Sequence, residues 1–289
     1  MTPGQQLRQA IQSDTIQVPG AANALTARMI EQFGFEAAYL SGAAFSASVL
    51  ALPDVGLFTL TELVNQTSQI TRRVNIPLLV DADTGFGDTI NVGRTIIELE
   101  AAGAAAIQLE DQQLPKRCGH LSGKTLVSVD EMCQKIKAAT TARTDPNLVI
   151  IARTDARGVS DLAEALTRAQ RYVDAGADWI FPEALANEEE FASFSAAIEV
   201  PLVANMTEFG KSPLLTCEEL AELGYAVILY PVTLLRVAMK ASEAALGLLA
   251  ADGTQKDLLD LMQTRQELYD LLEYDDYEQR DRAQFGDPA

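Results

Sequence analysis

Short runs of aliphatic and β-branched residues alternate along the chain with longer amphipathic stretches. Each run is followed by a polar or glycine-containing turn, which is the pattern of parallel βα units. Amphipathic stretches with helical periodicity lie at 59–74, 91–103, 128–140 and 161–176. The short runs, which we interpret as strands, lie at 15–20, 37–42, 76–83, 105–111, 148–154, 178–184, 201–206 and 226–231. About eight βα units predict an α/β fold of the closed (β/α)₈, or TIM-barrel, type.

The length fits one such barrel with an appendage. The chain has 289 residues, and we find no Ser/Gly-rich linker or internal repeat that would favour two domains. Residues 251–289 read as helical and then strongly acidic, which is more than the closing helix of a barrel requires. We therefore expect a barrel domain over 1–250 and a C-terminal helical extension with an acidic tail over 251–289, the extreme end being disordered.

Charge and cysteine usage narrow the class of protein. The net charge of −19 argues against nucleic acid and anionic membrane surfaces as partners, and no apolar run reaches transmembrane length. The cysteines, Cys118, Cys133 and Cys217, are odd in number and are not arranged in metal-ligand pairs, which is typical of a reducing cytosol. We expect a soluble, cytoplasmic protein. A polycarboxylate substrate would need local Arg, Lys or a divalent cation to overcome the overall negative field.

Polar side chains stand at the ends of nearly all the expected strands. In a (β/α)₈ barrel these ends form one face, and that face carries the active site. Polar residues also end strands simply to cap the following helix, so each residue taken alone carries little weight. Taken together, they predict one pocket lined by Ser41, Gly42, Asp81, Asp83, Glu110, Asp111, Arg153, Thr154, Asp155, Glu183, Asn205 and Thr207.

Two of these residues point to a metal ion. Asp81 and Asp83 project to the same side of one strand end because side chains alternate with period two. Two adjacent carboxylates repel each other unless a cation lies near them. Glu110, at the end of the next strand, would complete an oxygen-rich site of the kind that magnesium prefers. A DxD pattern alone is weak and fits a turn equally well.

Residues 114–124 form the most unusual segment of the chain. This loop brings together Lys116, Arg117, Cys118 and the single histidine, His120. Cationic neighbours make a thiol more reactive, and a long glycine-containing loop in a compact domain is usually functional. We therefore take Cys118, His120, Lys116 and Arg117 as candidate catalytic residues, against the alternative of an exposed basic loop with an accidental cysteine.

Three arginines are candidates for carboxylate recognition, because a guanidinium group binds a carboxylate through two parallel hydrogen bonds. Arg153 is the strongest candidate because it ends a strand. Arg236 follows the last expected strand by a few residues. Arg265 lies in a helical pattern, where a solvated surface position is the default.

At Lys-Arg-Cys-Gly-His (116–120) the chain resembles the isocitrate lyase and phosphoenolpyruvate mutase superfamily, in which this loop marks the lyases. The resemblance covers almost the whole chain and is nearest to the 2-methylisocitrate lyases. It is carried in order by YLSG, LPDVG, LLVDADTGFG, EDQQLPKRCGH, ARTDA, FPEA, ANMTEFG, ILYP and GTQK with MQTRQELY. Ala43 in place of the usual Gly, and HLSGK in place of HRPNK, depart from the enterobacterial pattern.

The resemblance implies roles for individual residues. Asp81, Asp83 and Glu110 would hold Mg²⁺, for which Mn²⁺ can substitute, directly or through water. The substrate would contact Ser41, Gly42, Ala43, Cys118, Gly119, Arg153, Glu183, Asn205, Met206, Thr207, Arg236 and Arg265.

The implied reaction is cleavage of the tricarboxylate 2-methylisocitrate to pyruvate and succinate, in the methylcitrate cycle of propionate breakdown. Phe181 stands where isocitrate lyases carry a bulkier Trp, which would leave room for one more methyl group. The resemblance also suggests a homotetramer whose terminal helices exchange between subunits. The alternatives are a lyase or hydrolase acting on 2,3-dimethylmalate, isocitrate or oxaloacetate, or a barrel that has lost catalysis and serves only to bind.

Overall fold

Residues 1–285 are described by a computed structural model of the chain. Within them the chain forms eight strands in the order expected from the sequence, each inside one of the predicted runs. All eight predicted strand positions are thus confirmed. The strands are β1 (Ile16–Pro19), β2 (Ala38–Leu40), β3 (Leu78–Asp81), β4 (Ala106–Glu110), β5 (Val149–Thr154), β6 (Trp179–Pro182), β7 (Val203–Asn205) and β8 (Val227–Tyr230).

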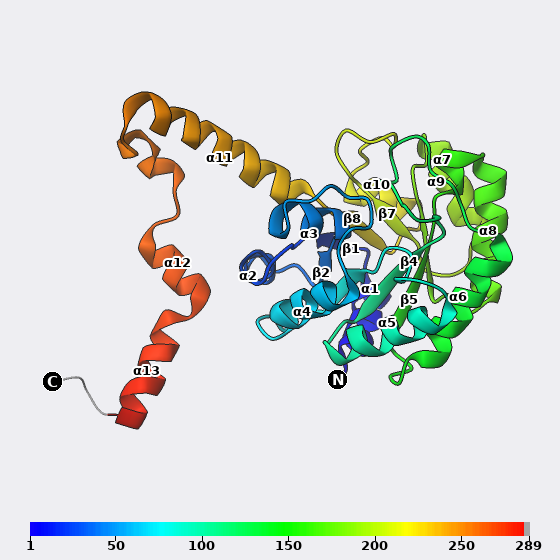
Figure 1. The fold of residues 1–289 in the computed structure, drawn as a ribbon, viewed down its shortest axis with the longest axis horizontal. Coiled ribbons are helices and arrows are strands. Elements are labelled where there is room, and N and C mark those ends of the chain that lie inside the picture. Colours follow the sequence, from blue (N-terminus) through cyan, green and yellow to red (C-terminus); the bar gives the residue numbers. More distant parts are fainter. Residues whose placement is uncertain (286–289) are drawn as a thin grey trace. The chain divides into compact units, whose positions relative to one another are not determined.

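The strands pair in parallel and close into a ring (Figure 1). Hydrogen-bonded ladders join β2 through β6 in chain order and join β1 to β8 and β8 to β7. Isolated parallel bridges, between Gly20 and Tyr39 and between Ile180 and Leu202, make the two remaining junctions. The N–H of Ala21 donates to the carbonyl of Tyr39 at 2.8 Å, and the N–H of Ile180 donates to the carbonyl of Pro201 at 3.1 Å. The barrel predicted from the strand pattern is therefore confirmed.

Amphipathic helices surround this ring, and each begins at a residue suited to the position. The helix α4, for example, starts with a capping box between Thr59 and Glu62 and buries Leu63 and Ile70 on one face. Helices α4, α5, α6 and α8 match the four predicted helical stretches. The helices of the barrel are α1 (Pro3–Ser13), α2 (Ala24–Gln32), α3 (Gly42–Val49), α4 (Leu60–Thr71), α5 (Thr89–Ala101), α6 (Val129–Ala142), α7 (Ala156–Val159), α8 (Leu162–Asp174), α9 (Glu188–Ala197) and α10 (Cys217–Glu222).

Alternation along each strand divides the apolar residues into two clusters. On β4, Ile107 and Leu109 belong to the outer cluster under the helices, whereas Ala106 belongs to the cluster inside the barrel. On β6, Trp179 and Phe181 fill the interior. The barrel is thus packed with side chains below its carboxyl face, as in other barrels of this type.

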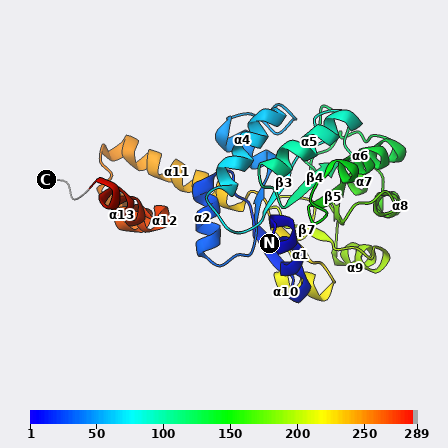
Figure 2. The ribbon, with the colours of Figure 1, turned by 90° about the horizontal axis from the view of Figure 1, so that it is seen from below.

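The helix α1 covers the opposite, amino-terminal end of the strands (Figure 2). Leu7 is fully buried within the interior cluster. Arg8 donates from Nε to the carbonyl of Asn147 at 2.9 Å and forms a 2.7 Å ion pair with Asp178. This end of the barrel is therefore closed by packing and charge pairing.

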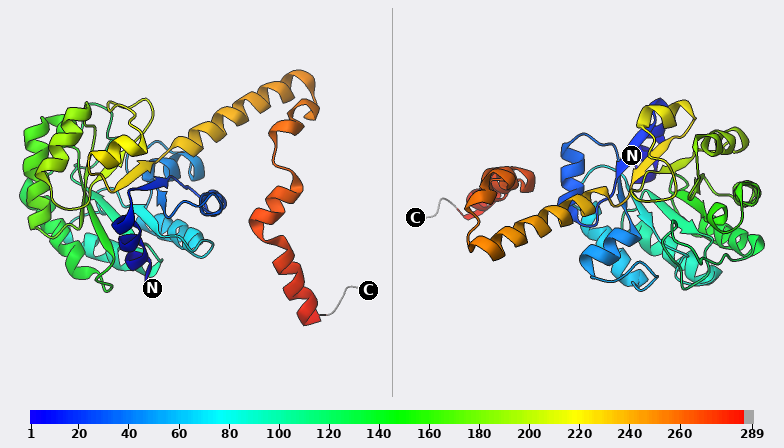
Figure 3. Two further views of the ribbon diagram at one scale, coloured as in Figure 1. Left: turned by 180° about the vertical axis from the view of Figure 1, so that it is seen from behind. Right: turned by 90° about the horizontal axis from the view of Figure 1, so that it is seen from above.

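The chain separates into two compact units, Met1–Leu235 and Arg236–Ala289. The second holds most of α11 (Thr233–Asp252), followed by a 3₁₀ helix (Lys256–Leu261), α12 (Arg265–Leu272) and α13 (Tyr274–Phe285), which Figure 3 shows in two further views. The predicted boundary at residue 250 stays a prediction. Among the described residues, no helix has both the length and the apolar character needed to cross a bilayer.

The acidic end is more ordered than we expected. Disorder is a wrong prediction for 274–285, which form α13. Basic residues interleaved among the acidic ones explain the helix, because they form pairs one turn apart such as Arg282 with Glu278 at 3.3 Å. Residues 286–289, where the expected acidic tail ends, lie outside the described residues.

Candidate active site

Charged side chains from neighbouring strands meet at the carboxyl face of the barrel. Asp81 ends β3, Glu110 ends β4, Arg153 lies near the end of β5, and Glu183 directly follows β6. All four are buried, and the loop 114–124, here called the reaction loop, lies against Arg153 and Glu183. Residues scattered over the sequence are therefore brought together as predicted.

Asp81 is held by three hydrogen-bond donors. Its carboxylate accepts the backbone N–H of Gly42 at 3.1 Å, the backbone N–H of Asp83 at 3.2 Å and the side-chain amide of Gln108 at 3.1 Å. The amide oxygen of Gln108 in turn accepts the hydroxyl proton of Tyr39 at 2.8 Å, inside the barrel. Such outer contacts fix the orientation of a metal-ligating carboxylate.

Asp83 faces the reaction loop. Lys116 lies 2.7 Å from Oδ1 of Asp83 and also contacts Asp54. Burial raises the pKa of Asp83 to about 7, although Lys116 acts to lower it. Burial acts to lower the pKa of Lys116, but Asp83, Glu110 and Asp54 outweigh it and raise the pKa well above its ordinary value. Lys116 is therefore a buried cation among carboxylates.

One carboxylate oxygen of Glu110 is buried without a hydrogen-bond donor among the described residues. Its Oε2 lies 3.5 Å from Nε of Arg153, while its buried Oε1 accepts no hydrogen bond from the residues the structure describes. Burial raises the pKa of Glu110 well above the usual range despite the opposing charges of Arg153 and Lys116. A cation or a cation-bound water next to Oε1 would stabilise the ionised form.

The donor set fits a hard divalent ion held partly through water. Asp81, Asp83 and Glu110 offer only oxygen, and magnesium is commonly bound by one or two carboxylates while it keeps several waters. Within 1–285, no three or more His, Cys, Asp or Glu side chains are arranged as a ready-made cage. The residues thus fit magnesium with water in its coordination shell rather than an all-protein site.

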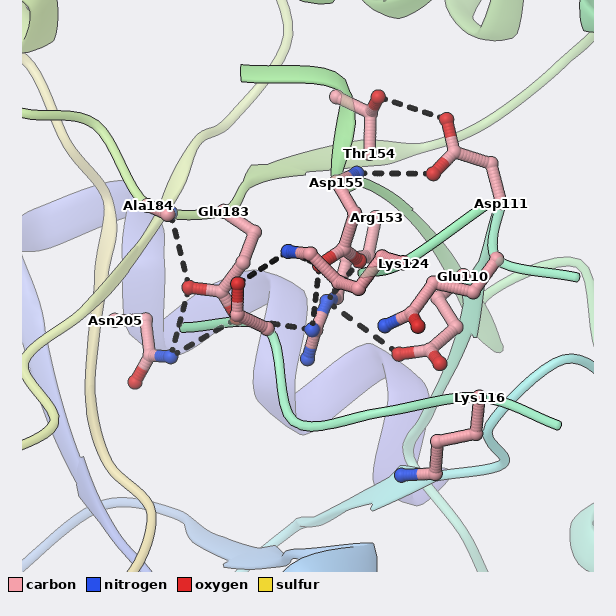
Figure 4. A network of polar contacts seen from close by, with 12 residues as sticks. Glu110, Asp111, Lys116, Lys124, Arg153, Thr154, Asp155, Glu183, Ala184 and Asn205 are labelled. Atoms are coloured by element: carbon pink, nitrogen blue, oxygen red, sulfur yellow. Dashed lines mark hydrogen bonds and ion pairs between the residues drawn. The ribbon is translucent and has the colours of Figure 1, made fainter. Parts of the chain in front are cut away.

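Glu183 is the centre of a second cluster (Figure 4). Its carboxylate lies 3.0 Å from NH2 of Arg153 and 2.9 Å from Nε2 of His120, and accepts hydrogen bonds at 3.3 Å from Asn205 and at 3.0 Å from the N–H of Ala184. Burial acts to raise the pKa of Glu183, but Arg153 and His120 outweigh it and hold the pKa well below the usual range. Glu183 is therefore an anion.

Arg153 is held in place from several sides. Asp155 accepts from it at 2.9 and 3.1 Å, and its guanidinium lies 5.3 Å from the ring centroid of Phe181. Lys124 also donates to Asp155 at 2.6 Å. Asp111 accepts the backbone N–H of Asp155 at 2.9 Å, which fixes the turn. Phe181 thus supports the arginine from inside the barrel.

The reaction loop is anchored at several points. Lys116 binds the Asp54 and Asp83 carboxylates, and Lys124 binds both Asp155 and the carbonyl of Gly119. A side chain at Gly119 would place its Cβ 2.4 Å from both Arg153 and Glu183, so only glycine allows this approach. Cys118, next to Gly119, is partly exposed. The loop therefore places Gly119, the residue after Cys118, against Arg153 and Glu183.

Other predicted site residues lie apart from these charges or already have structural partners. Arg117 turns toward the carbonyl of Ser122 on the surface. Met206 is buried in the outer cluster, and Ser41 caps α3 by accepting the N–H of Ala44 at 3.3 Å. Arg236 and Arg265 belong to the second unit and stay predictions, as do the roles of Ala43 and Thr207.

Sequence reasoning missed three residues of this site. Asp54, Gln108 and Lys124 are not among the site residues predicted from the sequence. An amide within the otherwise apolar run that precedes Glu110 is a signal that could have identified Gln108. Nothing local distinguishes Asp54 from an ordinary turn residue, because its partner lies 62 positions away in the chain.

A closed barrel that gathers buried carboxylates, an arginine and a thiol-bearing loop at one face is, by class, a barrel enzyme. The phosphoenolpyruvate phosphomutase family profile matches residues 7–250. The chain belongs to the phosphoenolpyruvate mutase/isocitrate lyase superfamily.

Individual relatives cover nearly the whole chain. A 2-methylisocitrate lyase of Aeropyrum pernix is 55% identical over 280 residues, covering 96% of this chain and 90% of that protein. One of Bacillus subtilis is 50% identical over 270 residues, covering 93% and 89%.

Solved structures agree with the fold. A 2,3-dimethylmalate lyase is similar with a TM-score of 0.92 at 34% identity, covering 99% of this chain and 96% of that one. A phosphonopyruvate hydrolase in complex with oxalate and Mg²⁺ is similar with a TM-score of 0.87 at 32% identity, covering 99% of both chains.

Proposed function

We infer that this chain is a 2-methylisocitrate lyase, which cleaves 2-methylisocitrate to pyruvate and succinate with magnesium. The observation that carries this inference is the docking of the Cys118 loop on the Arg153 and Glu183 pair beside three buried carboxylates. The identity of 55% to a 2-methylisocitrate lyase over 96% of the chain supports the substrate.

The site offers the charges that a tricarboxylate needs. Arg153 of β5 and the reaction-loop residues Lys116 and Lys124 are all buried cations. A buried cation attracts an anion far more strongly than an exposed one, because the effective dielectric constant is lower. Together with a bound divalent cation, these side chains would supply the local attraction that the net charge of −19 opposes.

Cleavage breaks the bond between C2 and C3 of the substrate. The hydroxyl group gives its proton to a base of the site and becomes the ketone of pyruvate, while the electron pair of the broken bond stays on the succinyl carbon. Arg153, held by Asp155, stabilises the negative charge that develops there. Cys118 then donates a proton to that carbon, which completes succinate.

Magnesium would be held by Asp81, Asp83 and Glu110, directly or through water. When bound, it polarises the hydroxyl and the adjacent carboxylate of the substrate and orients them. Gln108 and Gly42 keep Asp81 turned toward that position. The support is the oxygen-only donor set with its unpaired Glu110 oxygen, together with the Mg²⁺ in the similar phosphonopyruvate hydrolase.

A coupled assay tests the proposal. Pyruvate release from 2-methylisocitrate and glyoxylate release from isocitrate are measured with magnesium and with excess chelator. Pyruvate that requires magnesium, with little glyoxylate, is the expected result, and Cys118→Ser serves as the background control. Pyruvate from 2,3-dimethylmalate alone, or oxalate from oxaloacetate, would reassign the substrate. No turnover of any of these acids would favour a barrel that only binds.

We further propose that the enzyme is a homotetramer in which terminal helices exchange between subunits. The support lies in α11, none of whose residues is buried and whose Val237, Met239 and Leu246 are each more than half exposed. Apolar side chains in such number on one helix usually mark an interaction surface. Sedimentation equilibrium at micromolar concentration tests this, and a monomer there contradicts it.

A further inference from the structure

The loop after β7, residues 207–216 and here called the β7 loop, receives the side chain of His120. The backbone N–H of Lys211 donates to Nδ1 of His120 at 2.9 Å. The other ring nitrogen, Nε2, lies 2.9 Å from Oε1 of Glu183. Because Nδ1 accepts a hydrogen bond from a backbone N–H, a neutral ring carries its own proton on Nε2. His120 therefore joins the reaction loop both to the barrel and to the β7 loop.

Gly210 makes this contact possible. A Cβ added at Gly210 would lie 2.7 Å from Nδ1, 2.9 Å from Cε1 and 3.1 Å from Cγ of His120, and these are its three nearest atoms. The backbone itself does not require glycine, since Gly210 is not among the residues with positive φ. The close approach of the imidazole thus accounts for the absence of a side chain at this position.

The β7 loop has anchors that do not involve His120. At its start, the carboxylate of Glu208 accepts the hydroxyl proton of Thr233. At its end, the N–H of Leu215 donates to the sulfur of Met206 at 3.4 Å. Phe209, directly before Gly210, has φ 59°, which is uncommon for a bulky side chain and marks a constrained turn. The turn that presents the Lys211 N–H is therefore held by its own contacts.

We propose that Gly210 and the backbone N–H of Lys211 form a built docking site for His120, and that Gly210 is a positioning residue for the Cys118 thiol. His120 lies two residues after Cys118, so seating the ring at this site fixes the segment that carries the thiol. In this arrangement Nδ1 of His120 is bonded to the β7 loop and Nε2 lies 2.9 Å from Glu183, so the ring serves to position the loop. The positioning of the Cys118 thiol for catalysis rests on the proposed function. The docking of His120 does not.

A double-mutant cycle tests the docking in the full-length protein. His120→Ala, Gly210→Ala and the double variant are compared by hydrogen exchange of the 114–124 amides without substrate, and by kcat and KM for 2-methylisocitrate. Gly93→Ala is the matched control, because its added Cβ would meet only Ala142 at 3.7 Å. Exchange of 129–142 reports whether each variant stays folded.

If the proposal holds, each single variant raises exchange of the reaction loop by about fivefold or more, the scale of one lost hydrogen bond. Because both changes remove the same contact, the double variant exchanges no faster than His120→Ala. Gly210→Ala lowers kcat by about tenfold or more, because even a small displacement of the Cys118 thiol from its position beside the substrate slows the reaction. His120→Ala also raises exchange at the Lys211 amide, a measurement that needs no substitution in the β7 loop.

The proposal is overturned if Gly210→Ala leaves the exchange of the reaction loop unchanged, if its effect multiplies with that of His120→Ala, or if the Lys211 amide stays protected without His120. Exchange is measured without substrate. A non-additive cycle in a protein that does not cleave 2-methylisocitrate would therefore remove the proposed function and leave the docking site in place.

Discussion

The ammonium nitrogen of Lys116 lies 2.7 Å from Oδ1 of Asp83. A side chain of the reaction loop thus neutralises a carboxylate that we assign to magnesium. Lys116 and the ion are both cations directed at the same group. The charge of Lys116 should therefore affect the affinity for magnesium. This effect can be measured as a binding constant, without an activity assay.

Replacing Lys116 by Met is expected to tighten magnesium binding to the substrate-free enzyme by about tenfold or more. Two like unit charges about 4 Å apart repel by about 4 kcal/mol at an effective dielectric constant of about 20, and Mg²⁺ carries two such charges. Titration calorimetry with Mg²⁺ measures the change. Lys137→Met, at an exposed position on α6, is the control and should leave affinity unchanged. Weaker binding in Lys116→Met would show that the lysine supports the metal site.

Replacing Gln108 by Leu is expected to weaken magnesium binding by about 10- to 100-fold, the usual effect of losing an outer contact to a ligand. The amide donates to Asp81 at 3.1 Å, and leucine of similar size cannot. Tyr39→Phe, which removes only the hydroxyl that fixes the amide, should have a smaller effect in the same titration. Unchanged affinity in Gln108→Leu would mean that Gly42 and Asp83 orient Asp81 without it.

Replacing Cys118 by Ser is expected to lower turnover by at least about a hundredfold, the lower range for loss of an acid or base catalyst. Magnesium and product binding should persist, because the loop anchors at Lys116, His120 and Lys124 remain. Steady-state rates and succinate binding by calorimetry give both quantities. Cys217→Ser, at a position on α10, is the matched control. Near-normal turnover in Cys118→Ser would exclude the thiol as proton donor.

Replacing Tyr172 by Phe is expected to lower the free energy of unfolding by about 1.5–3 kcal/mol, the range for a hydrogen bond to a charged group. Its hydroxyl donates to the buried Asp111 at 2.7 Å, and Asp111 in turn fixes the turn at Asp155. Tyr225→Phe removes a hydrogen bond to a neutral carbonyl at 3.3 Å and should cost less. Urea denaturation followed by circular dichroism compares the two. Equal losses would argue against a charged partner for Tyr172.

Much of the fold could be predicted because each strand coincides with a short apolar run in the local sequence. The eight apolar runs and the four amphipathic stretches are all present in the structure. The helix α13 was not predicted, since the acidic composition of the extreme end suggested disorder, while the spacing of Arg282 and Glu278 allows pairing. Composition averages over a segment, whereas helix stability depends on which charges lie one turn apart.

The residues of the candidate site likewise fall into those that the sequence could predict and those that it could not. Asp81, Asp83 and Glu110 could be selected because they directly end strands, and the ends of parallel strands meet. Asp54 could not, because its significance comes only from Lys116, which a distant loop brings to it. The docking of His120 on Lys211 is equally hidden, since a backbone N–H leaves no mark in a sequence. Contacts between loops are therefore what local patterns miss.

The apolar layer inside the barrel has a consequence for how such enzymes diversify. The interior layer lies below the face that carries the charges and contains Val149, Ile151 and Trp179. Its packing does not depend on the charged residues above it. The reaction loop is attached to that face through three of its side chains, those of Lys116, His120 and Lys124. Exchanging residues 114–124 for another loop with the same anchors would leave the scaffold's folding intact. New reactions can thus be explored on this chain one loop at a time.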